Sequence, residues 1–171
     1  MSNQNLFLSN NDNAISNKYL EQGYIVVPVS DTDALSWIRE KFILIAREEL
    51  NISDDTSDSD MLNFIHERIS IPELNDFRLL IIKKINSLPD FRQKYYQIAK
   101  SYLDIIVGNE LSMQLKINLS IQLPKDESSL LPIHADTWSG DSPFEVVVWV
   151  PLVDCYKTKA MDILPPDKNQ I

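Results

Sequence analysis

Apolar residues recur along this chain first at helical spacing and later at the spacing of strands. Residues 14–23 (AISNKYLEQG) predict a helix that ends at Gly23, a residue type favoured just after helices. A short apolar run follows at 24–29, where Pro28 argues against a central, fully paired strand. The first part of the chain is therefore predicted to be helical, with residues 1–13 loose and disordered.

A longer helix is predicted after Asp31 or Thr32, either of which can cap its first turn. Its apolar residues recur at steps of three and four, which indicates one buried face: Leu35, Ile38, Phe42, Ile45 and Ala46. Pro72 and Pro89 then separate three more predicted helices, and Gly108 ends the last. These helices cover 61–69, 74–88 and 90–108.

After Gly108 the period changes to two. Residues 113–123 (MQLKINLSIQL) alternate between apolar and polar, which predicts a long half-buried strand. Residues 144–153 (FEVVVWVPLV) are apolar almost throughout, as in a strand buried on both faces, and 158–164 is read as the start of another. Helices followed by strands predict an α+β fold, with helices packed on one face of a mainly antiparallel sheet.

Charge and composition argue against several classes of function and partner. The net charge is −9, which disfavours nucleic acid or an anionic membrane as the main partner, because both require Lys and Arg. No apolar run approaches the roughly 18 residues that span a bilayer, and the polar N-terminus does not resemble a secretory signal. The single cysteine, Cys155, cannot form an internal disulfide, so we expect a cytoplasmic protein. Three glycines are too few for a Gly-rich phosphate loop.

Two features have an ordinary and a sharper interpretation. The acidic stretch 51–60 (NISDDTSDSD) suits a solvated linker, or a calcium loop without the central glycine and closing glutamate of an EF-hand. His66 suits a structural or surface histidine of its helix, or a metal ligand.

The pair His134 and Asp136 is the strongest candidate for chemistry. Two residues apart on an extended strand, their side chains project to the same face and can reach one cation. A histidine and a carboxylate form two thirds of the two-histidine, one-carboxylate facial triad that holds non-haem iron. Thr137 and Trp138 follow directly and are candidates to touch a substrate, or else belong to a turn around Gly140.

The polar face of 113–123 is open to two interpretations. Its side chains either face water or line a polar cavity beneath a barrel-like sheet. Three carboxamides on this face, together with Lys116, suit hydrogen bonding to a small anion: Gln114, Asn118 and Gln122.

The region 111–168 contains a His-x-Asp followed by VVVWVPLVD. With this motif it resembles the iron(II)- and 2-oxoglutarate-dependent oxygenases, in particular the phytanoyl-CoA-hydroxylase-like members of that family. It is most similar to the bacterial oxygenases encoded in carbohydrate gene clusters. The resemblance implies a double-stranded β-helix (a cupin-like jelly roll) with the helices outside, and hydroxylation of a small, carbohydrate-related molecule with iron(II) as cofactor and 2-oxoglutarate as cosubstrate. It implies one oxygenase-like domain over 14–171, helical over 14–108, with 109–171 as the first half of the jelly roll. It also implies His134 and Asp136 as iron ligands, with the cosubstrate near Gln114, Asn118, Gln122 and Trp149.

The chain departs from the family after this motif. It has no histidine after His134 and no arginine after Arg92, so the family's third ligand and its cosubstrate-anchoring base have no counterpart. A jelly roll has about eight strands, and roughly half are expected here. We therefore expect a C-terminally truncated oxygenase, or else a degenerate relative. Two alternatives stay open: a catalytically dead jelly-roll binding module, and a cupin-like metal protein without 2-oxoglutarate turnover. Uncovered strand edges would favour self-association.

Overall fold

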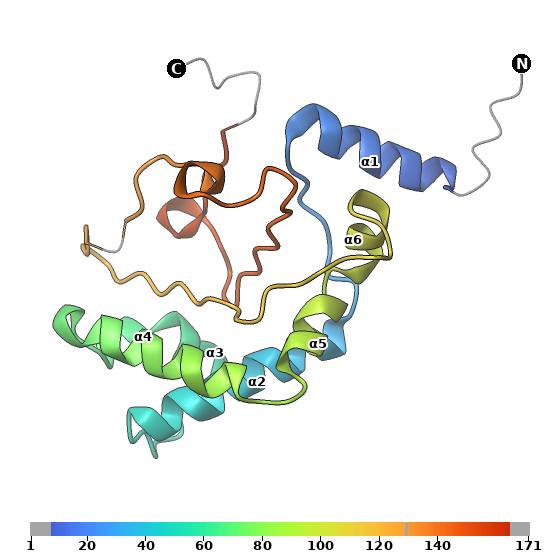
Figure 1. Cartoon of the computed structure of the whole chain (residues 1–171). Helices are drawn as coiled ribbons and strands as arrows, with labels where there is room; N and C mark the ends of the chain where they lie inside the picture. Colours follow the sequence, from blue (N-terminus) through green and yellow to red (C-terminus); the bar gives the residue numbers. More distant parts are fainter. Residues whose placement is uncertain (1–7, 129, 165–171) are drawn as a thin grey trace, which may run out of the picture.

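The computed structural model describes residues 8–128 and 130–164, and within these residues it is helical without a β-strand (Figure 1). The helices are α1 (Asn10–Gln22), α2 (Thr32–Glu49), α3 (Asp58–Asn63), α4 (Ile71–Asn86), α5 (Phe91–Gln97) and α6 (Lys100–Ile106). Three 3₁₀ turns complete the elements: η1 (Ile65–Glu67), η2 (Asp136–Ser139) and η3 (Lys157–Lys159). The predicted α+β jelly roll is therefore wrong for the described residues.

Local capping signals explain where the helices begin and end. Ser9 and Asp12 form a capping box, so α1 begins at Asn10, earlier than the predicted residue 14, and it ends at Gly23 with φ 75°. The segment expected to be loose over 1–13 thus enters a helix at its end, and residues 1–7 lie outside the described part. Asp31 caps α2 by accepting the Ala34 backbone N–H at 2.8 Å.

The later helices differ from prediction in their bounds. Pro72 lies within the first turn of α4, where its missing N–H has no cost, so this helix begins before the proline instead of after it. The single helix expected over 90–108 is divided into α5 and α6, because Ala99 leaves helical geometry with φ −124° and ψ 3°. Nothing in the periodicity of this stretch marks that break.

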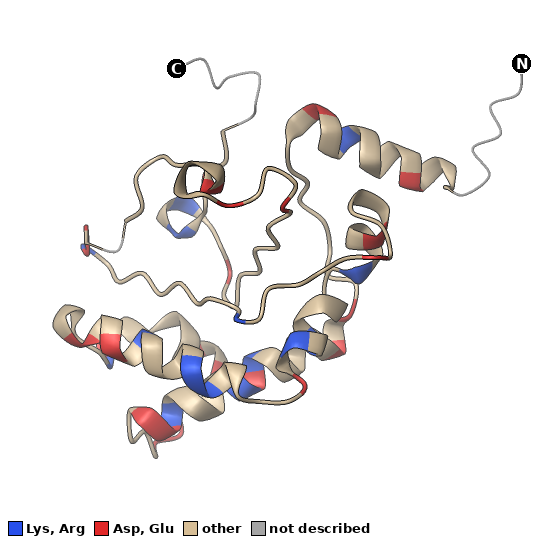
Figure 2. Ribbon diagram, viewed as in Figure 1, with Lys and Arg blue, Asp and Glu red and all other residues tan. Residues whose placement is uncertain are grey.

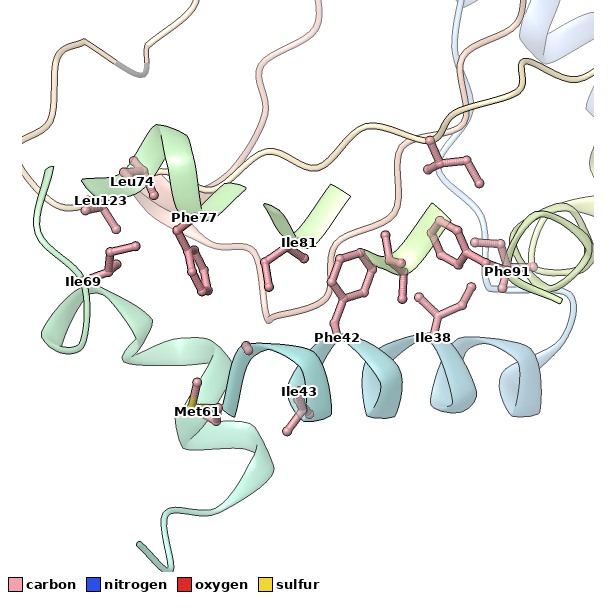
Figure 3. Packing of buried hydrophobic residues seen from close by; sticks show 14 of the residues in the cluster. Ile38, Phe42, Ile43, Met61, Ile69, Leu74, Phe77, Ile81, Phe91 and Leu123 are labelled. Carbon is pink, nitrogen blue, oxygen red and sulfur yellow. The ribbon is translucent and has the colours of Figure 1, made fainter. Parts of the chain in front are cut away.

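The core lies between α2, α4 and α5, and Figure 3 shows the buried side chains that meet there. Phe91 is 1% exposed and its ring meets that of Phe42 edge-on, with centroids 6.1 Å apart. Ile38 and Ile81 are also almost fully buried. Three- and four-residue spacing therefore identified the buried face of α2 correctly at Ile38 and Phe42.

Residues 113–123 cross the helical layer as an extended segment without a strand partner in the described part of the chain. Burial alternates as predicted over 117–123, since Ile117 and Leu123 are buried and the polar residues between them are exposed. Leu115, which the alternation also places on the buried face, is 78% exposed at a bend of the chain. Helix side chains take the place of a neighbouring strand. The Asn86 amide donates to the Ile117 carbonyl (2.9 Å) and accepts the Ile117 N–H (2.8 Å), and Arg92 donates to the carbonyl of Met113 (2.9 Å).

Residues 144–153 were predicted to be buried on both faces, and this is wrong. Val150 and Leu152 pack against the core, whereas Phe144, Val147 and Trp149 are 90%, 62% and 46% exposed. This segment also docks through a helix side chain and not through a strand ladder. The start of a strand expected at 158–164 is instead a 3₁₀ turn at Lys157–Lys159 followed by irregular chain.

Tyr95 on α5 holds this second segment by donating its hydroxyl to the Val148 carbonyl at 2.7 Å. Burial raises the pKa of Tyr95 to about 12, from the usual value of about 10. The folded protein therefore retains the phenol proton more tightly than the unfolded chain does. The resulting stabilisation is complete below about pH 10 and is lost as the pH rises through 12.

We expect Tyr95→Phe to lower the free energy of unfolding by about 1 kcal/mol at pH 8, because one hydrogen bond is lost. Above pH 10 the parent protein should lose about 2 to 3 kcal/mol that the non-titrating variant keeps, so the difference should reverse. Urea denaturation of both proteins between pH 8 and 11.5 measures this. Parallel curves over the whole range would contradict the role assigned to burial of Tyr95.

Candidate metal centre

The chain brings His134 and Asp136 together at the entry to η2. Ala135 between them is extended, with φ −122° and ψ 138°, so the two flanking side chains project to the same side. The His134 Nε2 lies 3.7 Å from the Asp136 Oδ1. Both side chains are about half exposed, at 47% and 51%. The predicted convergence of these two residues is therefore present, on an irregular segment that turns into a 3₁₀ helix rather than on a sheet strand.

The tautomer of His134 follows from its second contact. Its Nδ1 lies 2.7 Å from the Pro132 carbonyl oxygen. Because a carbonyl oxygen only accepts, the Nδ1 carries the hydrogen, and the neutral ring keeps the lone pair on Nε2. That lone pair is on the side of Asp136. Metal-ligating histidines commonly donate the other ring N–H to a carbonyl in this way, which holds the ring in position.

These donors fit two positions of a metal site. Bonds from histidine nitrogen and carboxylate oxygen to a first-row divalent ion are each about 2.1 Å, so two of them span at most about 4.2 Å. A separation of 3.7 Å lies within that reach. No group of three or more His, Cys, Asp or Glu in the described residues gathers as a metal-binding cluster. The described part of the chain thus offers two candidate ligands, and iron(II) would need its remaining positions filled by other molecules or groups.

The other histidine does not complete the site. His66 lies in η1, and its ring contacts Phe64 with centroids 6.1 Å apart. Asp141 follows η2 and donates its backbone N–H to the Asp136 carbonyl at 3.4 Å, so it belongs to the turn that ends η2. Gly140 ends η2 with φ 101°, a conformation that glycine adopts without strain.

The predicted substrate residues lie beside the pair by their position in η2. Trp138 is 62% exposed and Thr137 is exposed as well. Trp138, His134 and Asp136 are thus all accessible from solvent, so a small molecule can reach them. The 3₁₀ turn itself agrees with the alternative that these residues belong to a turn.

The predicted cosubstrate residues face solvent. Gln114, Asn118 and Gln122 are exposed on the side of 113–123 away from the core, as the water-facing alternative predicts. Trp149, also exposed, lies on the outer side of the second extended segment. No hydrogen bond or ring contact among the described residues joins the side chain of Gln114, Asn118 or Trp149 to His134 or Asp136.

A hollow of about 400 Å³ next to α5 is lined by residues that sequence reasoning did not select. Arg92 lies in it with Tyr96 and Asn109. The Arg92 guanidinium already donates to the Met113 and Gln114 carbonyls, so its charge is committed to holding the extended segment. An arginine on an ordinary amphipathic helix carries no sequence signal of such a role.

The acidic stretch 51–60 is mostly exposed, as the solvated-linker interpretation predicts, and two arginines hold it in place. Arg68 donates to the Asp54 carboxylate (2.8 Å) and Arg47 to the Asp54 carbonyl (3.3 Å). The hydrogen bonds from Thr56, followed by Arg68, lower the pKa of Asp54. Figure 2 shows how acidic and basic residues mix along the helices of this half. These contacts use the Asp54 carboxylate, and no group of three or more metal-ligating side chains gathers in the described residues, so the calcium interpretation gains no support.

Comparison with protein-family models, with curated proteins and with solved structures found no match for this chain. None of the helices in the described part combines the length and the apolar composition that crossing a bilayer requires. The resemblance to the iron(II)- and 2-oxoglutarate-dependent oxygenases therefore rests on the sequence motif, and the geometry of His134 and Asp136 is the structural observation that bears on function.

Proposed function

We propose that this protein binds iron(II) through His134 and Asp136 and acts as a 2-oxoglutarate-dependent oxygenase on a small, carbohydrate-related molecule in the cytoplasm. The observation that carries the proposal is the 3.7 Å separation of the Nε2 and Oδ1 atoms, with Nδ1 held by the Pro132 carbonyl. The net charge of −9 disfavours nucleic acid as the substrate.

The residues have separate roles in this proposal. The Pro132 carbonyl keeps the His134 proton on Nδ1 and so leaves Nε2 free to bind the metal. The Asp136 carboxylate supplies a charged oxygen that neutralises part of the charge of a divalent ion. Iron(II), when bound, supplies a redox-active centre at which dioxygen can oxidise an organic substrate. Trp138, exposed beside the pair, offers an apolar surface for the substrate.

The second candidate is a metal-binding protein without 2-oxoglutarate turnover. The observation that favours it is that the side chains of Gln114 and Asn118 are exposed and have no hydrogen bond to His134 or Asp136 among the described residues. Both candidates require the metal, and they differ in whether 2-oxoglutarate binds and is consumed.

Anaerobic titration of iron(II) into the purified protein, with and without 2-oxoglutarate, tests both candidates. We expect one equivalent of iron to bind, and a metal-to-cosubstrate absorption band to appear only when 2-oxoglutarate is present. His134→Ala and Asp136→Asn should each weaken iron binding by at least about 10-fold, because one of two protein ligands is lost. His66→Ala removes the other histidine and should bind iron like the parent.

Each outcome has a distinct meaning. Iron binding that depends on His134 without the absorption band would favour the metal protein over the oxygenase. Equal weakening by His66→Ala and His134→Ala would show that the metal binds elsewhere. Absence of iron binding to the parent would exclude both candidates and leave the His134–Asp136 pair as an ordinary surface ion pair.

A further inference from the structure

We propose that two copies of this chain associate through residues 145–149, which pair as antiparallel strands about a two-fold axis at Val147. The contact would be a short two-stranded ribbon, held by backbone hydrogen bonds and by the side chains on its outer face. The inference is independent of the metal site, because it rests on other residues and on their unpaired backbone groups.

Residues 145–150 form an extended segment whose side chains alternate between two sides. Glu145, Val147 and Trp149 are exposed, whereas Val146 and Val148 between them are half-buried, as period two requires. Figure 1 draws this part of the chain open, without a strand beside it. The segment therefore has the conformation of a strand but lacks the neighbour that a strand pairs with.

One edge of this segment is occupied and the other is unpaired. In an extended chain, the N–H and C=O of one residue point to one edge, and those of the next residue point to the opposite edge. The Tyr95 hydroxyl donates to the Val148 carbonyl at 2.7 Å, so even-numbered residues face α5. The backbone groups of Val147 and Trp149 point the other way, and no hydrogen bond in the described part of the chain uses them. Such an edge is a template for another strand.

The ends of the segment define its midpoint. A turn precedes it, in which the Glu145 N–H donates to the Ser142 carbonyl at 3.0 Å. Pro143 lies in this turn and Pro151 follows the segment, and each is four residues from Val147. Because proline has no N–H, it ends a hydrogen-bonded ladder. The segment is therefore bounded symmetrically about Val147, as a pairing with itself requires.

Antiparallel pairing about Val147 uses the unpaired groups and no others. The N–H and C=O of Val147 would bond to those of the partner's Val147, and the Trp149 N–H would donate to the partner's Glu145 carbonyl. The Glu145 N–H stays with Ser142 and is not needed. A shift of the register by two residues in either direction would bring a proline into the ladder, where its missing N–H leaves an acceptor without a donor.

Side chains and charge favour a second copy in this orientation. Valine and tryptophan are among the residue types that stabilise cross-strand pairs, and Val147 and Trp149 are 62% and 46% exposed without a partner strand. Glu145 is the one charged residue of the segment, in a chain whose net charge of −9 makes most contacts between copies repulsive. Antiparallel pairing places it opposite the partner's Trp149, whereas parallel pairing would place two glutamates together.

A cysteine cross-link tests the register. In a hydrogen-bonded antiparallel pair the Cα atoms lie about 5.5 Å apart, which a disulfide can bridge. Val147→Cys in a Cys155→Ser background should therefore give a covalent dimer under mild oxidation, seen on non-reducing gels. Glu145→Cys in the same background is the matched control. It is also exposed, but its two copies would lie about 14 Å apart, beyond disulfide reach.

Light scattering with Val147→Pro tests the backbone pairing. Proline removes the N–H at the centre of the ladder in both copies, so the dimer dissociation constant should rise by at least about 10-fold. Val147→Ala keeps this N–H and should weaken association less. Helical circular dichroism should stay unchanged in both variants, because the Tyr95 contact lies at the other edge.

Three results would overturn the proposal. The first is a parent protein that stays monomeric up to about 1 mM. The second is cross-linking of Glu145→Cys that equals or exceeds that of Val147→Cys. The third is a dissociation constant that Val147→Pro changes no more than Val147→Ala does, because the contact would then not depend on the backbone.

Discussion

Phe91→Ala is expected to lower the free energy of unfolding by about 3 to 5 kcal/mol, the largest effect of any single substitution considered for this chain. Phe91 is 1% exposed where α5 meets α2. Its ring packs edge-on against Phe42 at 6.1 Å and against Tyr95 at 6.2 Å between centroids. Alanine removes the apolar surface, leaves a cavity and ends both ring contacts.

The loss would be a large part of the stability of a domain of this size, which is typically about 5 to 15 kcal/mol. Urea denaturation followed by circular dichroism measures it. Phe144→Ala is the matched control, because it makes the same chemical change at a residue that is 90% exposed. The control should change stability by less than about 0.5 kcal/mol. Equal losses at both positions would contradict the packing of α5 against α2.

Asn86→Ala should cost about 2 to 4 kcal/mol, because it leaves two backbone groups of one buried residue unpaired. Ile117 is 5% exposed, and its N–H and C=O both bond to the Asn86 amide. Each unpaired buried group costs about 1 to 3 kcal/mol. The segment would otherwise have to leave the helices and expose Ile117 and Leu123 to water, which also costs free energy.

Hydrogen exchange at the Ile117 N–H, together with urea denaturation, checks this expectation. The exchange should speed up in Asn86→Ala beyond what the loss of global stability explains. Asn75 lies on the same helix, and its exposed side chain accepts a hydrogen bond from Arg78, so Asn75→Ala serves as the control. If both variants behave alike, the Asn86 contact does not hold the extended segment.

Much of the helical half was predictable because its signals are local. A cap needs only the residues of one turn, so Asp31 and Gly23 marked their helix ends in the sequence. The break between α5 and α6 was not predictable, because the helical pattern continues through Ala99 and the change of direction depends on tertiary packing.

The part of the candidate site that neighbouring residues form was predictable from the sequence. A spacing of two in extended chain brings His134 and Asp136 to one side, and they lie together as expected. The positions of Gln114 and Trp149 depended on a barrel closing around them. Without strand pairing in the described residues, these side chains face outward.

The sequence by itself determined most of the helices, the buried face of α2 and the inward and outward sides of 117–123, because these follow from caps and from periods of 3.6 and 2. Only the tertiary structure decided what the extended segments pair with. Period two shows that a segment is extended and half buried, but backbone groups can be satisfied by any donor or acceptor that lies opposite them. Here those groups are the side chains of Asn86, Arg92 and Tyr95 on the helices, which no local pattern reveals.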